Sequence, residues 1–190
     1  MVMHAFLAIA IVAATARGDV RPVFAAAPGG IVTAALPDTV LQDPAVHKQI
    51  TSGLTTVAVI IVTEKGTKSM GVARLEMRYD LWDEVWIVRK IEADGHVDRQ
   101  RIASFDALLQ WWHSPTRIFS STGTRAVLNV ELRLLPFSAA EEQDARDWIS
   151  KSGGVASPAA EGNFVQTLIA TTITARPITT YRWPVDILLK

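Results

Sequence analysis

Residues 55–63 (TTVAVIIVT) constrain the fold more than any other stretch of the chain, because they are β-branched and apolar at successive positions. A strand with one face in water alternates apolar and polar side chains, whereas a strand that is covered on both faces does not. Such a strand needs packed layers above and below it, so its place is the middle of a sheet. The sequence therefore predicts a layered domain built around this central strand.

Two other stretches carry the alternation of half-buried strands. In residues 73–79 and 128–134, apolar side chains alternate with arginine, glutamate or asparagine. A period of two places apolar residues on one face of a sheet and polar residues on the other. Further strands are predicted, with a hairpin turn at Asp94-Gly95, at residues 31–36, 84–91, 96–102 and 164–175. Residues 179–190 are predicted to form a last short strand or a tail.

Two segments have the signals of helix ends. Asp43 before Pro44 is a capping residue followed by proline in the first turn, and Ser52-Gly53 is a stop signal. Together they predict a helix over residues 44–52. Ser138 and Glu141 form a capping box that opens a helix to about residue 149.

A third helix is predicted after Ser104. Its apolar residues have the spacing of a single helix face, which must pack on the sheet: Phe105, Leu108, Leu109 and Trp112. Trp111 lies to one side of this stripe. Large amphipathic rings at such positions are favoured in interfaces, so Trp111 is a candidate contact with a partner. The alternative is that Trp111 covers a margin of the sheet within the same molecule.

These elements predict an α+β fold, in which an antiparallel sheet meander of about five to seven strands packs against two or three helices. Residues 1–16 are predicted to be a signal peptide that forms an N-terminal helix, and residues 17–30 a tether rich in Pro, Gly and Ala. Residues 31–190 then form one domain, with a flexible loop at residues 150–163 (SKSGGVASPAAEGN).

The N-terminal segment also predicts where the protein is located. Residues 5–16 (AFLAIAIVAATA) form an apolar run that ends on Ala14-Thr15-Ala16, the pattern of a cleavage site. As a helix this run would span about 18 Å, less than the roughly 30 Å of a bilayer's hydrocarbon core. The sequence therefore predicts a secreted or periplasmic protein with no stable membrane span in the mature chain. A retained N-terminal anchor and a buried first helix of a cytosolic protein are the alternatives.

Cysteine content and charge exclude several classes of site. The sequence contains no cysteine, which excludes disulfides, thiolate metal sites and cysteine nucleophiles. Lys and Arg number 19, as do Asp and Glu, so the net charge is zero. Because this balance gives no long-range field of either sign, binding of nucleic acid or of an anionic membrane is not predicted.

Three short motifs between residues 31 and 149 occur in a familiar order. They are Ser52-Gly53-Leu54 at the end of the first helix, Arg78-Tyr79-Asp80 in a charged strand, and Ser104-Phe105 at the start of the amphipathic helix. In this order the chain resembles a family of exported bacterial proteins known only as domain of unknown function 4390. The resemblance implies an envelope location, and it brings no catalytic residues with it.

No residue is predicted to be catalytic, and the sequence implies no cofactor and no metal. His96-Val97-Asp98 places an imidazole and a carboxylate on one face of a strand, where they can hold a weak metal site or orient a base. An exposed hairpin pair is the simpler interpretation of these residues.

The predicted loop between two strands gathers acidic and aromatic residues. Asp80, Asp83 and Glu84 lie in the sequence beside Trp82 and Trp86. A tryptophan ring can stack on the apolar face of a sugar while carboxylates bind its hydroxyl groups or perform acid/base chemistry. Trp82, Asp83 and Glu84 are therefore a candidate carbohydrate site, and a solvated turn with one buried tryptophan is the alternative.

Three functions are compatible with the sequence. The first is a non-catalytic envelope protein that acts as an interaction or binding module, with a protein partner or a second copy on the Trp111 side. The second is a carbohydrate-binding or carbohydrate-acting protein that uses the candidate site at Trp82. The third is a carrier of an apolar ligand, in a cavity lined by Phe105, Leu109 and Trp112.

Overall fold

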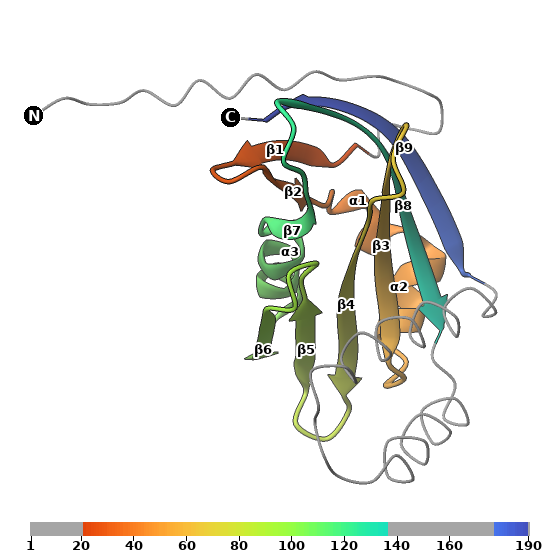
Figure 1. Ribbon diagram of the computed structural model, residues 1–190. Coiled ribbons are helices and arrows are strands. Elements are labelled where there is room, and N and C mark those ends of the chain that lie inside the picture. Colours follow the sequence, from red (N-terminus) through yellow and green to blue (C-terminus); the bar gives the residue numbers. More distant parts are fainter. Residues whose placement is uncertain (1–20, 137–176, 190) are drawn as a thin grey trace, which may run out of the picture.

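The computed structural model describes residues 21–136 and 177–189, which form two antiparallel sheets and three short helices (Figure 1). The smaller sheet has three strands, in the spatial order β1 (Val23–Ala27), β2 (Ile31–Ala35) and β7 (Thr116–Ser120). The larger sheet has six, in the order β6 (Val97–Ile102), β5 (Val85–Ile91), β4 (Met70–Asp80), β3 (Thr56–Glu64), β8 (Arg125–Pro136) and β9 (Thr179–Leu188). The α+β class is confirmed, but the predicted single sheet is replaced by two.

Four predicted segments lie outside the described residues. They are the signal segment at residues 1–16, the helix after Ser138, the loop at residues 150–163 and the strand at residues 164–175.

Strand β3 has the predicted central place in the larger sheet, between β4 and β8. Ala58, Ile60 and Val62 are buried on the face that carries the main core. Val57 and Val59 are buried on the opposite face, where they form a second small cluster with Leu135. The apolar side chains of β3 are therefore buried on both faces of the sheet, as expected for a strand that is covered on both sides.

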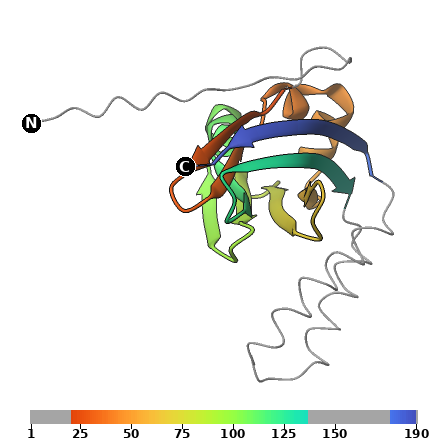
Figure 2. The ribbon, with the colours of Figure 1, turned by 45° about the horizontal axis from the view of Figure 1, so that its top comes forward.

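The remaining strands add on both sides of β3. Strands β3 to β6 form the predicted meander, in which each strand pairs with the next. Strand β8 pairs with the other edge of β3, and β9 pairs with β8. Figure 2 shows β8 and β9 curving towards the β1–β2 hairpin, where Phe24 of β1 lies edge-on against Trp183 of β9.

The β1–β2 hairpin corrects the prediction of a tether through residue 30. Val23 to Ala27 pair with β2 in an antiparallel register that runs from Val23 opposite Ala35 to Ala27 opposite Ile31. Gly29 and Gly30 form the turn with φ values of 82° and 72°, and positive φ at both central residues is typical of tight hairpin turns. The glycines that indicated a tether form the hairpin turn, and the alanines form a strand with small side chains.

Strand β7 was not predicted, because its five residues are too few to show a period. It pairs with β2 and packs across β4, where the two sheets approach each other closely at Gly71. A Cβ atom on Gly71 would lie 2.2 Å from the carbonyl oxygen of Ile118. Only glycine allows this contact between the two backbones.

The three helices are α1 (Thr39–Gln42), α2 (Pro44–Ile50) and α3 (Phe105–His113). The predicted caps of α2 and α3 are confirmed, because the Asp43 side chain accepts bonds from two backbone N–H groups of α2 and Ser104 accepts one from Ala107. Apolar residues of all three helices and of the smaller sheet join one core against the larger sheet. The opposite face of the larger sheet, called the outer face below, carries the small cluster of Val57, Val59 and Leu135 and a number of charged side chains.

None of the helices in residues 21–136 and 177–189 is long and apolar enough to cross a membrane.

Candidate functional site

The candidate carbohydrate residues lie at the tip of the β4–β5 hairpin. One carboxylate oxygen of Asp80 accepts hydrogen bonds from the backbone N–H groups of Trp82, at 3.0 Å, and Asp83, at 3.3 Å. These two bonds hold the pKa of Asp80 below its ordinary value. Glu84 adopts a φ of 52°, which turns the chain into β5. The loop therefore has a defined turn geometry from which Trp82 projects, with 95% of its surface exposed.

Two carboxylates of this loop are engaged by groups of the protein itself. Asp83 is engaged by Arg101 of β6, with 2.5 Å between the carboxylate oxygen and the guanidinium nitrogen. Asp80 is occupied by the turn itself. Trp86, the neighbouring tryptophan, is buried in the core against Tyr79. The loop thus offers an exposed indole ring beside an ion pair.

Trp111 is enclosed within the chain, since its side chain is only 5% exposed. The Nζ atom of Lys90 lies 5.3 Å from the centre of the indole ring, within the range of a cation–π contact. Lys90 also donates hydrogen bonds to the hydroxyl and the carbonyl oxygen of Ser114, at the end of α3. Burial lowers the pKa of Lys90, against the opposing influence of nearby carboxylates. Trp111 is therefore part of the junction between α3 and β5.

The residues proposed to line an apolar cavity are packed into the core. Trp112 is fully buried, and its indole N–H donates a hydrogen bond of 3.0 Å to the carbonyl oxygen of Pro37. Phe105 and Leu109 pack against the same core from a partly exposed position. These side chains are part of the core between α3 and the larger sheet.

Two of the histidines, His47 and His113, are held by structural contacts. His113 pairs through Nδ1 with the carbonyl oxygen of Leu36 at 3.0 Å, and His47 lies edge-on against Phe105. The predicted His96 and Asp98 pair lies at an exposed turn, where Asp98 accepts a bond from Gln100. Within residues 21–136 and 177–189, no three histidine or acidic side chains are grouped to hold a metal ion.

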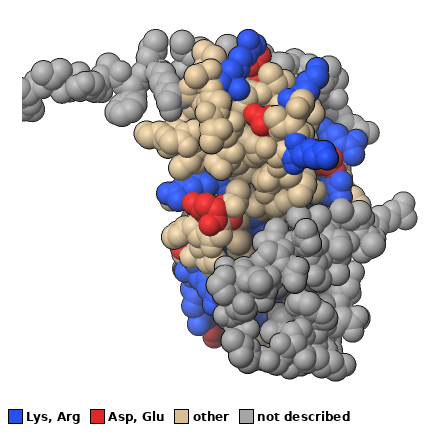
Figure 3. All heavy atoms as spheres, viewed as in Figure 1, with Lys and Arg blue, Asp and Glu red and all other residues tan. Residues whose placement is uncertain are grey.

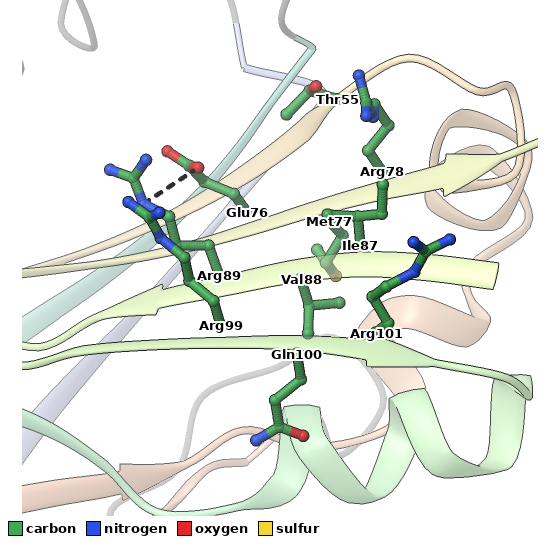
Figure 4. Close-up of a pocket in the computed structure, with 10 residues that line it drawn as sticks. All are labelled: Thr55, Glu76, Met77, Arg78, Ile87, Val88, Arg89, Arg99, Gln100 and Arg101. Atoms are coloured by element: carbon green, nitrogen blue, oxygen red, sulfur yellow. Dashed lines mark ion pairs between the residues drawn. The ribbon is translucent and has the colours of Figure 1, made fainter.

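A groove of about 640 Å³ lies on the outer face of the larger sheet, across β4, β5 and β6. Its charged lining consists of Arg78, Arg89, Arg99 and Arg101, together with Glu76, and Ile87 lies among them. We call these six residues the arginine groove. Figure 4 shows the guanidinium groups of Arg89 and Arg99 close together, with Arg78 and Arg101 on either side of Ile87.

The sheet register explains why the arginines gather. Arg89 on β5 lies directly opposite Arg99 on β6, and Glu76 on β4 is the other neighbour of Arg89. One row along, Ile87 lies between Arg78 on β4 and Arg101 on β6. Side chains at alternate positions of a strand share a face, so both rows project from the same side of the sheet.

The positive charges of the groove are only partly neutralised. Glu76 contacts Arg74 at 2.7 Å and Arg89 at 3.6 Å, so one carboxylate serves two guanidinium groups. Arg101 is paired with Asp83. Arg78 and Arg99 form no ion pair with any carboxylate in the described part of the chain.

The charge of the groove differs from the balanced charge of the chain as a whole. In Figure 3, basic and acidic groups of the described residues lie close to one another, as expected for a chain with 19 of each. The balance of the whole sequence therefore concealed a local excess. The one signal available in the sequence was the charged face of residues 74–78, together with Arg99 and Arg101 two positions apart.

Comparison with protein family models, with characterised proteins and with solved structures finds no match to this chain.

Proposed function

We propose that this protein is a non-catalytic binding protein of the cell envelope that binds an anionic ligand in the arginine groove. The observation that carries the proposal is the pair of guanidinium groups, on Arg78 and Arg99, that face the groove without an ion-pair partner among the described residues. Arginine is the side chain best suited to hold carboxylate or phosphate oxygens, because its planar group donates two parallel hydrogen bonds.

The direct opposition of Arg89 and Arg99 supports the same conclusion. Like charges on directly opposite residues of neighbouring strands destabilise a sheet, by roughly 0.2–1 kcal/mol. Glu76 neutralises the charge of Arg89 only in part, since it also forms an ion pair with Arg74. A bound anion would remove this repulsion and satisfy the donors of both groups. The arrangement is therefore costly without a ligand and favourable with one.

Two further arguments support a binding role in the envelope. Among the described residues, the lining of the groove includes no histidine, serine or aspartate, and its one carboxylate, Glu76, is engaged by Arg74 and Arg89. The apolar run at residues 5–16 and the family resemblance favour export to the periplasm or the cell surface.

The proposal is tested with fluorescently labelled anionic polymers, one of glutamate and one of phosphate. We expect saturable binding that weakens as the salt concentration rises, because the contacts are ionic. Arg78→Gln and Arg99→Gln should each weaken binding by roughly ten-fold, the equivalent of one charge-assisted hydrogen bond. Lys68→Gln is the matched control, because Lys68 is an exposed cation in the β3–β4 turn, beyond the far end of β4.

If neither polymer binds, the proposal is wrong. It is equally wrong if both polymers bind but Arg78→Gln and Arg99→Gln behave like Lys68→Gln, because binding would then reflect general charge and not the groove.

A carbohydrate-binding role at Trp82 is the second candidate, and the exposure of the Trp82 ring favours it. Stacking of a sugar on this ring would change its fluorescence, and Trp82→Ala would abolish the change. We expect Trp86, Trp111 and Trp112 to contribute nothing to the response, because they are buried. An unchanged spectrum across a panel of glycans would remove this candidate.

A further inference from the structure

We propose that the arginine groove contains two anion subsites and that its ligand is a small molecule with two phosphate groups. This inference rests on the proposed function and names the ligand class of that same site. The first subsite lies between Arg89 and Arg99, and the second lies over Ile87 between Arg78 and Arg101 (Figure 4).

The register sets the distance between the subsites. On β5, Arg89 and Ile87 are two residues apart, and each marks one row across β4, β5 and β6. Two residues of an extended strand span about 7 Å. The anionic groups of the ligand should therefore be separated by about this distance, which a direct phosphate–phosphate linkage cannot reach but a linker of a few atoms can.

The chemistry of each subsite favours phosphate over carboxylate. Each subsite combines two guanidinium groups from two different strands, of which one also contacts a carboxylate, Glu76 in the first subsite and Asp83 in the second. A carboxylate has one negative charge and two oxygens, which a single guanidinium fork satisfies. A phosphate group carries about −1.5 to −2 charges and three acceptor oxygens, so it can accept from two forks at once.

The surroundings of the groove favour a short ligand. Beyond the row of Arg89, the next row on the outer face has Ile91 on β5 opposite Val97 on β6, and its cation, Arg74 on β4, is already paired with Glu76 at 2.7 Å. Beyond the row of Arg78 lies the hairpin loop, with the carboxylates of Asp83 and Glu84. Apolar residues at one end and acidic residues at the other would disfavour the continuation of an anionic chain in either direction.

The test is a calorimetric titration with bisphosphates of straight-chain diols that differ in the number of methylene groups. We expect an intermediate length to bind most tightly, about 100-fold more tightly than methyl phosphate, because the second group binds intramolecularly. With Arg78→Gln or Arg99→Gln, the best bisphosphate should fall to the affinity of methyl phosphate and the dependence on length should disappear. Lys68→Gln should reproduce the wild-type series.

Two further experiments distinguish a bisphosphate ligand from other anionic ligands. Dicarboxylates of matched length should bind at least ten-fold more weakly than the bisphosphates. Vesicles that contain phosphatidylglycerol should bind weakly, and the best bisphosphate should displace the protein from them. Dicarboxylates of equal affinity, an affinity that does not vary with length, or vesicle binding that bisphosphate cannot displace would each overturn the inference.

The experiment with the glutamate and phosphate polymers distinguishes failure of the two-subsite inference from failure of the proposed function. If the glutamate and phosphate polymers bind through Arg78 and Arg99 but no bisphosphate binds more tightly than methyl phosphate, the two-subsite inference is wrong and the proposed function stands. If no anion of any kind binds, both are wrong. Circular dichroism of each variant establishes that the fold is retained in every arm.

Discussion

Arg89 and Arg99 are directly opposed across strands β5 and β6, and the one carboxylate of the described residues that contacts Arg89, Glu76, also contacts Arg74. A like-charged pair in this position weakens the sheet when no anion is bound. We expect Arg99→Thr to raise the free energy of unfolding by up to about 1 kcal/mol, because it removes the repulsion and places a strand-favouring residue on β6.

Urea denaturation at low ionic strength measures this effect. Arg182→Thr on β9 is the control, because Arg182 is also on the outer face but is paired with Glu131 at 3.0 Å. An Arg99→Thr protein that is less stable than the Arg182→Thr protein would show that the Arg89–Arg99 opposition is not repulsive.

The junction between Lys90 and α3 should depend on the ammonium group. Lys90 donates to the carbonyl oxygens of Ser114 and Trp111, which end α3 and would lose this partner in Lys90→Met. We expect Lys90→Met to lower the free energy of unfolding by about 1–3 kcal/mol, since the methionine fills the space without a donor. An unchanged midpoint in chemical denaturation would show that the bonds contribute nothing.

The lowered pKa of Lys90 also has a consequence at alkaline pH. Between the folded pKa and the ordinary value of 10.5, the unfolded chain binds more protons at this position than the folded chain. The free energy of unfolding of the wild type should therefore rise relative to that of Lys90→Met as the pH increases through this window. Parallel denaturation curves of the two proteins from pH 8 upwards, in steps of about half a unit, measure the difference. A difference that is constant or falls with pH would contradict the direction given for this pKa.

The turn that projects Trp82 should be sensitive to acid. The backbone N–H groups of Trp82 and Asp83 lower the pKa of Asp80 below 3.8, so the contribution of these bonds is present above 3.8 and is lost as pH falls through the folded pKa. We expect the Trp82 amide resonance to follow the titration of Asp80 in the wild type. Asp80→Asn keeps an acceptor at this position but cannot ionise, so the Trp82 amide should stop responding in that variant. A response that persists in Asp80→Asn would assign the titration to another group.

The close approach of the two sheets should be intolerant of a side chain at Gly71. A Cβ atom there would lie 2.2 Å from the carbonyl oxygen of Ile118, so β4 or β7 would have to move. We expect Gly71→Ala to lower the free energy of unfolding by about 1–3 kcal/mol or more. The control is Gly123→Ala, where the nearest atom to the Cβ would lie 3.3 Å away. Equal effects of the two substitutions on thermal unfolding would show that the sheets can separate without cost.

The parts of the fold that the sequence predicted are those in which local pattern and burial coincide. The apolar run of β3 and the alternation along β4 and β8 are long enough to be recognised in the sequence. Each of these strands has the burial pattern that its sequence predicts. Strand β7 could not be predicted in this way, because TRIFS is short and its partner β2 is distant in the sequence. The β1–β2 hairpin was also missed, since its alanines and glycines are as frequent in tethers as in tight hairpins.

The arginine groove could not be predicted from local sequence patterns, for a different reason. Each of its arginines is an ordinary polar residue on the solvent side of its own strand, and only the register of β4, β5 and β6 brings them together. Trp111 illustrates a related case: its place beside the helix stripe left open a contact with a partner or with a sheet margin of the same molecule, and the ring is buried beside Lys90 of β5. In both cases the decisive contact joins residues from different elements.

The most direct test of the binding role is a nuclear magnetic resonance titration of the arginine side-chain Nε–H signals with a short polyphosphate. We expect the signals of Arg78, Arg89 and Arg99 to shift together and to saturate, while those of Arg125 and Arg182, which are paired with carboxylates elsewhere on β8 and β9, stay in place. Shifts that are equal for all five arginines, or no shifts, would contradict the assignment of the groove as the binding site.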